Sequence, residues 1–82
     1  MVTYLNRNYK REPVKDAEVI NIYYKVNNAV MAMDDDEATT FINIVSDYEC
    51  EGGRANANRA RATAKKYGLT LQEVALWYCL DD

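Results

Sequence analysis

The sequence predicts an α+β domain in which a small antiparallel sheet is packed by three C-terminal helices. Residues 19–33 place apolar side chains opposite one another across two adjacent asparagines, as a β-hairpin does. Three later segments, at about 36–50, 54–67 and 70–80, have helical periodicity and are separated by glycines that end helices. At 82 residues, the chain has room for one domain over residues 1–82.

The N-terminal segment divides into an apolar start and a basic run. Residues 2–5, VTYL, suit a third strand of the sheet. Residues 6–17 carry four basic side chains around Pro13. Proline cannot donate to a sheet ladder and fits poorly inside a helix. We therefore expect residues 6–17 to form a basic loop or tail.

The hairpin prediction rests on a turn at Asn27-Asn28. Asparagine tolerates the positive φ of a two-residue turn, and β-branched and aromatic residues crowd the segment before it. Tyr23 then stands on the solvent side of the sheet. The apolar pairs across the turn are Val26 with Ala29, Tyr24 with Met31, and Ile22 with Met33.

The same segment also fits a helix, which makes an all-α bundle the alternative fold. Two adjacent asparagines weaken a helix centre, so we prefer the hairpin. The apolar stripe of the helical alternative consists of Val19, Ile22, Tyr23, Val26, Val30 and Met33.

Each C-terminal helix has signals at its ends. Asp34–Glu37 place negative charge where the first helix begins, and Gly52-Gly53 can end it. Gly68 can end the second helix, which is rich in alanine, arginine and lysine. Thr70 and Glu73 form a capping box at the start of the third.

The last helix is apolar almost all round, because Leu76 and Trp77 point away from the side that holds Leu71 and Val74. Such a helix lies either at the centre of the domain or under a partner.

The basic helix at 54–67 is the clearest functional feature. Arg54, Asn58, Arg61 and Lys65 fall within about 60° of one another by the helical period, and Arg59 lies on the adjoining side. Arginine pairs with phosphates and with carboxylates, so this face could bind either. The alternative is that these charges balance the chain's own carboxylates.

Residues 60–79 resemble a helix-turn-helix unit, with Ala64 as the small residue, Gly68 in the turn, and Val74 and Trp77 as apolar contacts. The resemblance implies that the two helices pack as a helix-turn-helix pair, and it is weaker support for sequence-specific DNA recognition. On the second helix only Thr70 and Gln72 could hydrogen-bond a base edge, and the net charge of −3 disfavours nucleic acid.

Composition argues against catalysis and against membrane insertion. There is no histidine, so the usual general base and the commonest zinc ligand are missing, and we expect no enzyme, no cofactor and no metal site. Cys50 and Cys79 are expected to be buried thiols. The acidic run 34–37 is explained as helix capping. No long apolar stretch or leader-like segment is present, and we expect a cytoplasmic protein without membrane contact.

We therefore expect a non-enzymatic protein-binding module, possessing the profile of small acidic inhibitors or regulators of host proteins of bacterial or phage type. A nucleic-acid-associated protein that uses the basic helix 54–66 is the alternative, and a homo-oligomeric structural protein held by the last helix is the second alternative. The expected partner-binding residues are Tyr23, Arg54, Arg59, Arg61, Lys65, Leu76 and Trp77.

Overall fold

The computed structural model describes residues 2–81 and has the expected α+β class. In chain order its elements are β1 (Thr3–Leu5), β2 (Arg11–Pro13), α1 (Ala17–Met31), α2 (Asp35–Glu51), α3 (Arg54–Lys66), α4 (Leu71–Cys79) and β3 (Leu80–Asp81).

The predicted C-terminal helices are confirmed to within about one residue at each end. Asp34 caps α2, its Oδ1 accepting from the Glu37 N–H at 2.8 Å, and Gly52 ends the helix at a φ of 69°. The capping box of α4 is complete: Thr70 Oγ1 accepts from the Glu73 N–H at 3.2 Å, and Glu73 Oε1 accepts from the Thr70 N–H at 2.9 Å.

The predicted hairpin at 19–33 is wrong, because residues 17–31 form helix α1. Asp16 caps it by accepting from the N–H groups of Glu18 and Val19 at 2.9 and 3.4 Å. Tyr23 and Val26, three residues apart, are both buried, as one face of a helix requires and as a hairpin does not allow. Burial of this face outweighs the poor helix propensity of the two asparagines.

The antiparallel sheet comes instead from the two ends of the chain. The strand predicted at 2–5 is confirmed as β1, which lies between β2 and β3. Thr3 pairs with Pro13 of β2 on one side and with Asp81 of β3 on the other.

The loop or tail predicted for 6–17 therefore contains a strand, and its last residue already belongs to α1. Pro13 is tolerated because β2 is an edge strand and Pro13 is its last residue, where a missing N–H need not break the ladder. Asn6 shapes the turn before β2, since its Oδ1 accepts from the N–H groups of Asn8 and Lys10.

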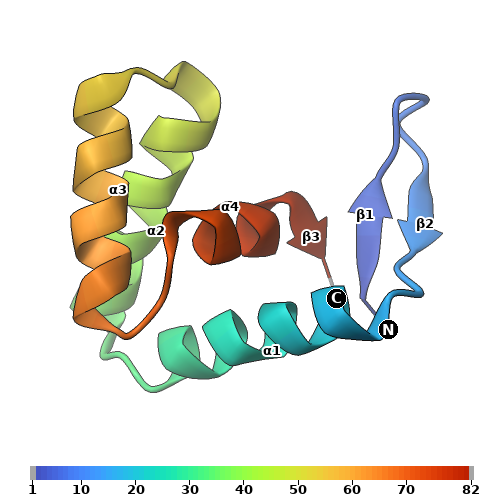
Figure 1. The fold of residues 1–82 in the computed structure, drawn as a ribbon, viewed down its shortest axis with the longest axis horizontal. Coiled ribbons are helices and arrows are strands. Elements are labelled where there is room, and N and C mark those ends of the chain that lie inside the picture. The colour runs from blue at the N-terminus through green and yellow to red at the C-terminus, as the bar shows by residue number, and fades with distance from the viewer. Residues whose placement is uncertain (1, 82) are drawn as a thin grey trace.

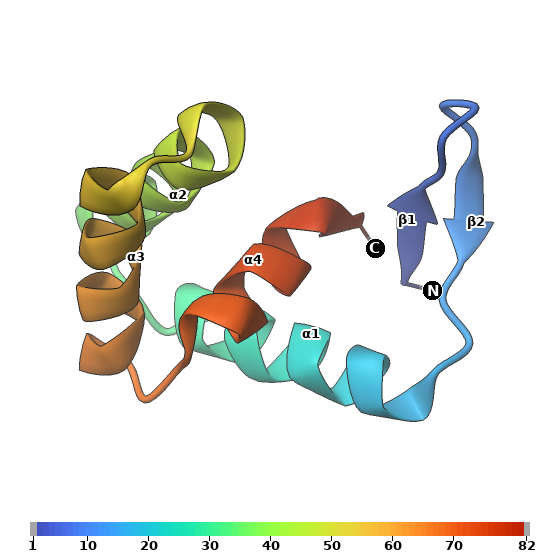
Figure 2. The ribbon, with the colours of Figure 1, turned by 45° about the horizontal axis from the view of Figure 1, so that its top comes forward.

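Helix α4 lies at the centre of the molecule (Figures 1 and 2). It contacts α1, α2 and α3, and the chain continues from it directly into β3. The α2 and α3 helices lie side by side at one end, α1 runs beneath α4, and the sheet stands at the other end (Figure 1). Of the two positions predicted for α4, at the centre of the domain or under a partner, the structure has the central one.

The core gathers on the inner faces of the four helices around Phe41. Phe41 is 1% exposed, and the centre of its ring lies 5.9 Å from the ring centres of both Tyr67 and Trp77. The buried members of this core are Val26, Phe41, Val45, Ala60, Ala64, Leu69, Leu71 and Val74. Over residues 2–81, no helix has the length and apolar character needed to cross a bilayer.

Asn28 distinguishes the helix from the hairpin experimentally. It is exposed within α1, so Asn28→Ala should raise the free energy of unfolding by about 0.5 kcal/mol and Asn28→Gly should lower it slightly. Urea unfolding of both variants measures this. A Gly variant more stable than the Ala variant would indicate a turn at this position.

The ion pair between α1 and α4 should make stability depend on pH. Lys25 Nζ donates to Glu73 Oε2 at 2.8 Å, and this bond, with those from Thr70, lowers the pKa of Glu73 below its ordinary value of 4.5. The stabilisation is therefore present above pH 4.5 and is lost as the pH falls through the lowered pKa.

We expect Glu73→Gln, which keeps a capping residue, to be less stable than the wild type at pH 7 and to approach it in acid. Urea unfolding at several pH values measures the difference. Introducing Lys25→Met into both backgrounds should shrink that pH dependence, and an unchanged dependence would show that Lys25 is not its cause.

Candidate protein interface on α3

The predicted basic residues of 54–66 are all on α3, and the structure brings them to its outer side. Ala60 and Ala64 are fully buried, which fixes the orientation of the helix. Arg54, Asn58, Arg61 and Lys65 are exposed and share one line along it. We call these four residues the basic row.

The chain's own carboxylates leave the basic row largely unpaired. The side chains of Arg54 and Lys65 make no ion pair or hydrogen bond with residues 2–80, and in that range Arg61 donates only to Asn58, at 3.1 Å. Arg59, outside the row, approaches Asp47 of α2 at 4.0 Å, with both side chains about half exposed. Among residues 2–80, an ion pair with one of the chain's own carboxylates is thus seen for Arg59 and not for the row.

The position of α2 explains why the row is unpaired. Asn56 faces α2, since its Nδ2 donates to the carbonyl oxygens of Gly52 and Asp47 at 2.9 and 3.4 Å. At about 100° per residue, the basic row lies on the opposite side of α3 from Asn56. The carboxylates of α2 are therefore on the wrong side of α3 to reach it.

The row continues toward the start of α4. Arg61 and Lys65 line a shallow depression of about 330 Å³ together with Thr70 and Gln72. Glu73, the carboxylate nearest in sequence, is engaged by Lys25 on the other side. The positive charge of this depression is thus not cancelled by a free carboxylate of α4.

Two expected partner-binding residues lie on the central helix. Leu76 and Trp77 are half-buried, and Trp77 packs against Phe41 in the core. Contacts within the chain thereby account for part of the apolar character of α4, whereas Tyr78 of the same helix is 37% exposed. The same packing covers the second helix of the helix-turn-helix-like pair, since α4 contacts α1 and α2 as well as α3.

The prediction that Tyr23 stands on the solvent side is wrong, because in α1 its side chain is buried and only 6% exposed. Tyr23 therefore offers little surface to a partner. Its ring packs edge-on against Tyr24, with the ring centres 5.4 Å apart. Tyr24, its neighbour, is 41% exposed.

The prediction of buried thiols is also wrong, because Cys50 and Cys79 are both exposed. Each lies at the end of a helix, where the side chains reach solvent. Partial burial and the Glu49 carboxylate, whose Oε2 lies 3.6 Å from Cys79 Sγ, raise the pKa of that thiol, which makes it a poorer nucleophile. Within residues 2–80, no three acidic or thiol side chains are grouped closely enough to hold a metal ion.

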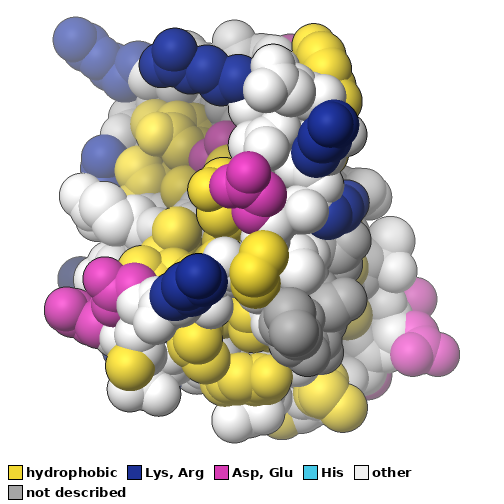
Figure 3. All heavy atoms as spheres, turned by 90° about the vertical axis from the view of Figure 1, so that its right-hand side faces the viewer, with side chains coloured by type: hydrophobic (Ala, Val, Ile, Leu, Met, Phe, Trp, Pro, Cys, Tyr) yellow, Lys and Arg dark blue, Asp and Glu magenta, His cyan; other side chains and the backbone are white. Residues whose placement is uncertain are grey.

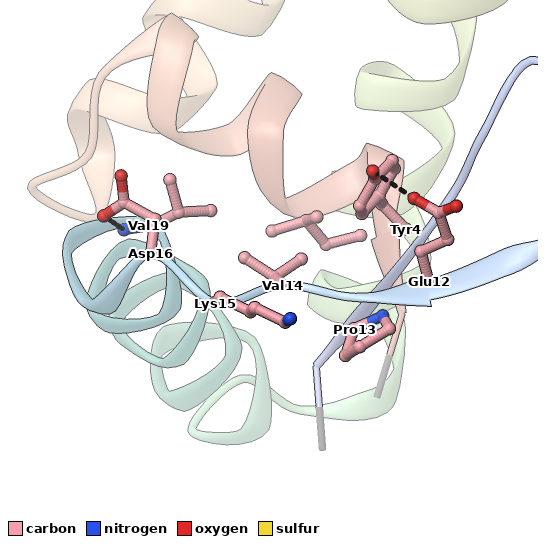
Figure 4. Close-up of a pocket in the computed structure, with 8 residues that line it drawn as sticks. Tyr4, Glu12, Pro13, Val14, Lys15, Asp16 and Val19 are labelled. Carbon is pink, nitrogen blue, oxygen red and sulfur yellow. Dashed lines mark hydrogen bonds between the residues drawn. The ribbon is translucent and has the colours of Figure 1, made fainter.

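A second surface feature, a groove, was not predicted from the sequence. A groove of about 670 Å³ lies between the hairpin of β1 and β2 and the start of α1, with Tyr4 donating to Glu12 at 2.5 Å along one wall (Figure 4). Hydrophobic side chains gather across the middle and lower part of this end of the molecule, broken by charges of both signs (Figure 3). The groove is lined by Tyr4, Glu12, Pro13, Val14, Lys15, Asp16, Val19 and Leu80.

This groove could not be found in the sequence, because its residues come from β1, β2, the connection between β2 and α1, α1 itself and β3, and β3 has no signal of its own. Its mixed charges do not favour one kind of ligand over another. The α3 surface, by contrast, has a single sign of charge.

No protein-family model matches the chain, and no curated protein or solved structure resembles it at a significant level. The surfaces of the structure are therefore the basis for proposing a function.

Removal of charge from the basic row should leave stability unchanged. The variant Arg61→Gln/Lys65→Gln loses no ion pair with residues 2–80, so its free energy of unfolding should stay within about 0.5 kcal/mol of the wild type. Urea unfolding measures this. A loss of more than about 1 kcal/mol would mean that the row does balance internal carboxylates.

Proposed function

We propose that this chain is a non-enzymatic protein-binding module that engages an acidic segment of a partner protein through the basic row of α3. The observation that carries the proposal is that Arg54 and Lys65 have no side-chain partner among residues 2–80, where Arg61 bonds only to the neighbouring Asn58. Guanidinium and ammonium groups that are exposed in a row and unused within the chain are available for carboxylates of another protein. Such complementarity gives specificity and speeds association.

A nucleic-acid partner is the second candidate, and the same basic row supports it. Three features weigh against it. The net charge is −3, which repels phosphates. Helix α4 is packed against three other helices, which hinders its entry into a groove. The basic row also contains no aromatic side chain on which single-stranded bases could stack.

The structure gives less support than the sequence to a homo-oligomer held by the last helix. Its support was the apolar character of α4, and the packing of Trp77 on Phe41 accounts for much of that. Partner binding through Trp77 would compete with its packing on Phe41.

Site-specific photo-crosslinking tests the proposal. Ala62 is exposed on the outer side of α3, next to Arg61, so a photoreactive residue there should form an adduct with a protein partner in an extract of the producing cells. We expect the adduct to map to an acidic segment, to weaken at high salt, where the Debye length falls to about 3 Å, and to disappear with Arg61→Gln/Lys65→Gln.

The matched control is the variant Arg7→Gln/Lys10→Gln, which removes the same charge from the exposed turn between β1 and β2. It should keep the adduct. Adducts to nucleic acid at position 62 would favour the second candidate, and the lack of any adduct dependent on Arg61 and Lys65 would refute both.

A further inference from the structure

The sequence of α3 repeats every seven residues. Residues 54–60 read RANANRA and residues 61–67 read RATAKKY. Arg54 returns as Arg61, Ala55 as Ala62 and Ala57 as Ala64, and the basic Arg59 returns as the basic Lys66. A seven-residue step returns a side chain to nearly the same side of a helix, so α3 presents continuous strips along its length.

The inward strip of the repeat is used within the chain. Ala60 and Ala64 are fully buried, and Ala57 packs against the same core. Small side chains there allow α3 to lie close to its neighbours. This half of the repeat is explained by the fold.

The outward strip has no such use. Ala55 and Ala62 are exposed and sit beside the basic row. A strip of small side chains lets another helix approach closely, and charged residues that flank such a strip select its partner. Small residues and a flanking row of one charge together describe half of a helix–helix contact.

Spacing along the row distinguishes a helical partner from an extended one. Arg54 and Arg61 are separated by about 10.5 Å along the helix axis, and Arg61 and Lys65 by about 6 Å. Carboxylates on one side of an extended chain recur about every 6.8 Å and cannot match both intervals. Carboxylates seven and four residues apart on an α-helix match both.

We infer that the partner segment is an α-helix laid along α3, with its carboxylates at intervals of seven and four residues opposite Arg54, Arg61 and Lys65. This inference rests on the proposed function. The length of α3, 13 residues, corresponds to about 20 Å, which limits the contact to about two heptads of the partner.

Three synthetic peptides of equal length and composition test the inference with the full chain. The first is an amphipathic helix with glutamates at the matching intervals beside a strip of alanines. The second spreads the same glutamates around the helix, and the third keeps the matching order but exchanges a central alanine with a terminal proline to break the helix. Fluorescence anisotropy at low salt measures their affinities.

We expect the first peptide to bind about tenfold more tightly than the other two, as about three modest ion pairs provide. Arg61→Gln/Lys65→Gln should remove that advantage. Arg59→Gln/Lys66→Gln removes equal charge from the flank of α3 nearer α2 and should reduce binding less. Circular dichroism of each variant verifies that it is folded.

The outcomes separate the inference from the proposed function. Equal binding of all three peptides, still dependent on Arg61 and Lys65, would refute a helical partner and leave an acidic partner supported. Binding that is insensitive to Arg61→Gln/Lys65→Gln, or no binding of any peptide, would overturn both.

Discussion

The burial of α4 is the constraint on which the rest of the structure depends. This helix is only nine residues long and apolar on nearly every side, so it needs cover from several directions. Leu71 and Val74 are buried, and Trp77 packs against Phe41. Helices α1, α2 and α3 supply that cover, and the chain leaves α4 as β3, which pairs with β1. The N-terminal strand is thereby tied to the C-terminal end of the chain.

The same constraint determines which surfaces are left for other molecules. Helix α3 packs against α4 and α2 through alanines, whose small side chains bury little apolar area but allow close packing. The charged residues of α3 must therefore face outward. Because α2 occupies the side of α3 that holds Asn56, its carboxylates reach Arg59 but not the basic row. An acidic chain consequently exposes a strip of positive charge that has no carboxylate partner among residues 2–80. The proposed binding role rests on that separation of charge and not on the tyrosines or on Trp77.

Much of the helical half could be predicted from the sequence, because its boundaries depend on local chemistry: Asp34, Gly52 and the Thr70–Glu73 box act within a few residues of themselves. The hairpin prediction failed for a specific reason. Its apolar pairs, Val26 with Ala29, Tyr24 with Met31 and Ile22 with Met33, are three, seven and eleven residues apart, and these are also helical repeats, so the pattern could not separate the two structures. Strands β2 and β3 are three and two residues long and exist through pairing with β1, which no local pattern encodes. The basic row was predictable from helical spacing, whereas the burial of Tyr23 depended on the fold of α1.

Native-state hydrogen exchange tests the central position of α4 most directly. The amide groups in the second half of α4, from Ala75 to Tyr78, are held by a helix packed on three sides, and core elements exchange only when the whole domain unfolds. We expect their exchange free energy to equal the global free energy of unfolding and to exceed that of the outer helix α3. Exchange of these amides through local opening, at a free energy below that of α3, would contradict the account and return α4 to the surfaces available for a partner.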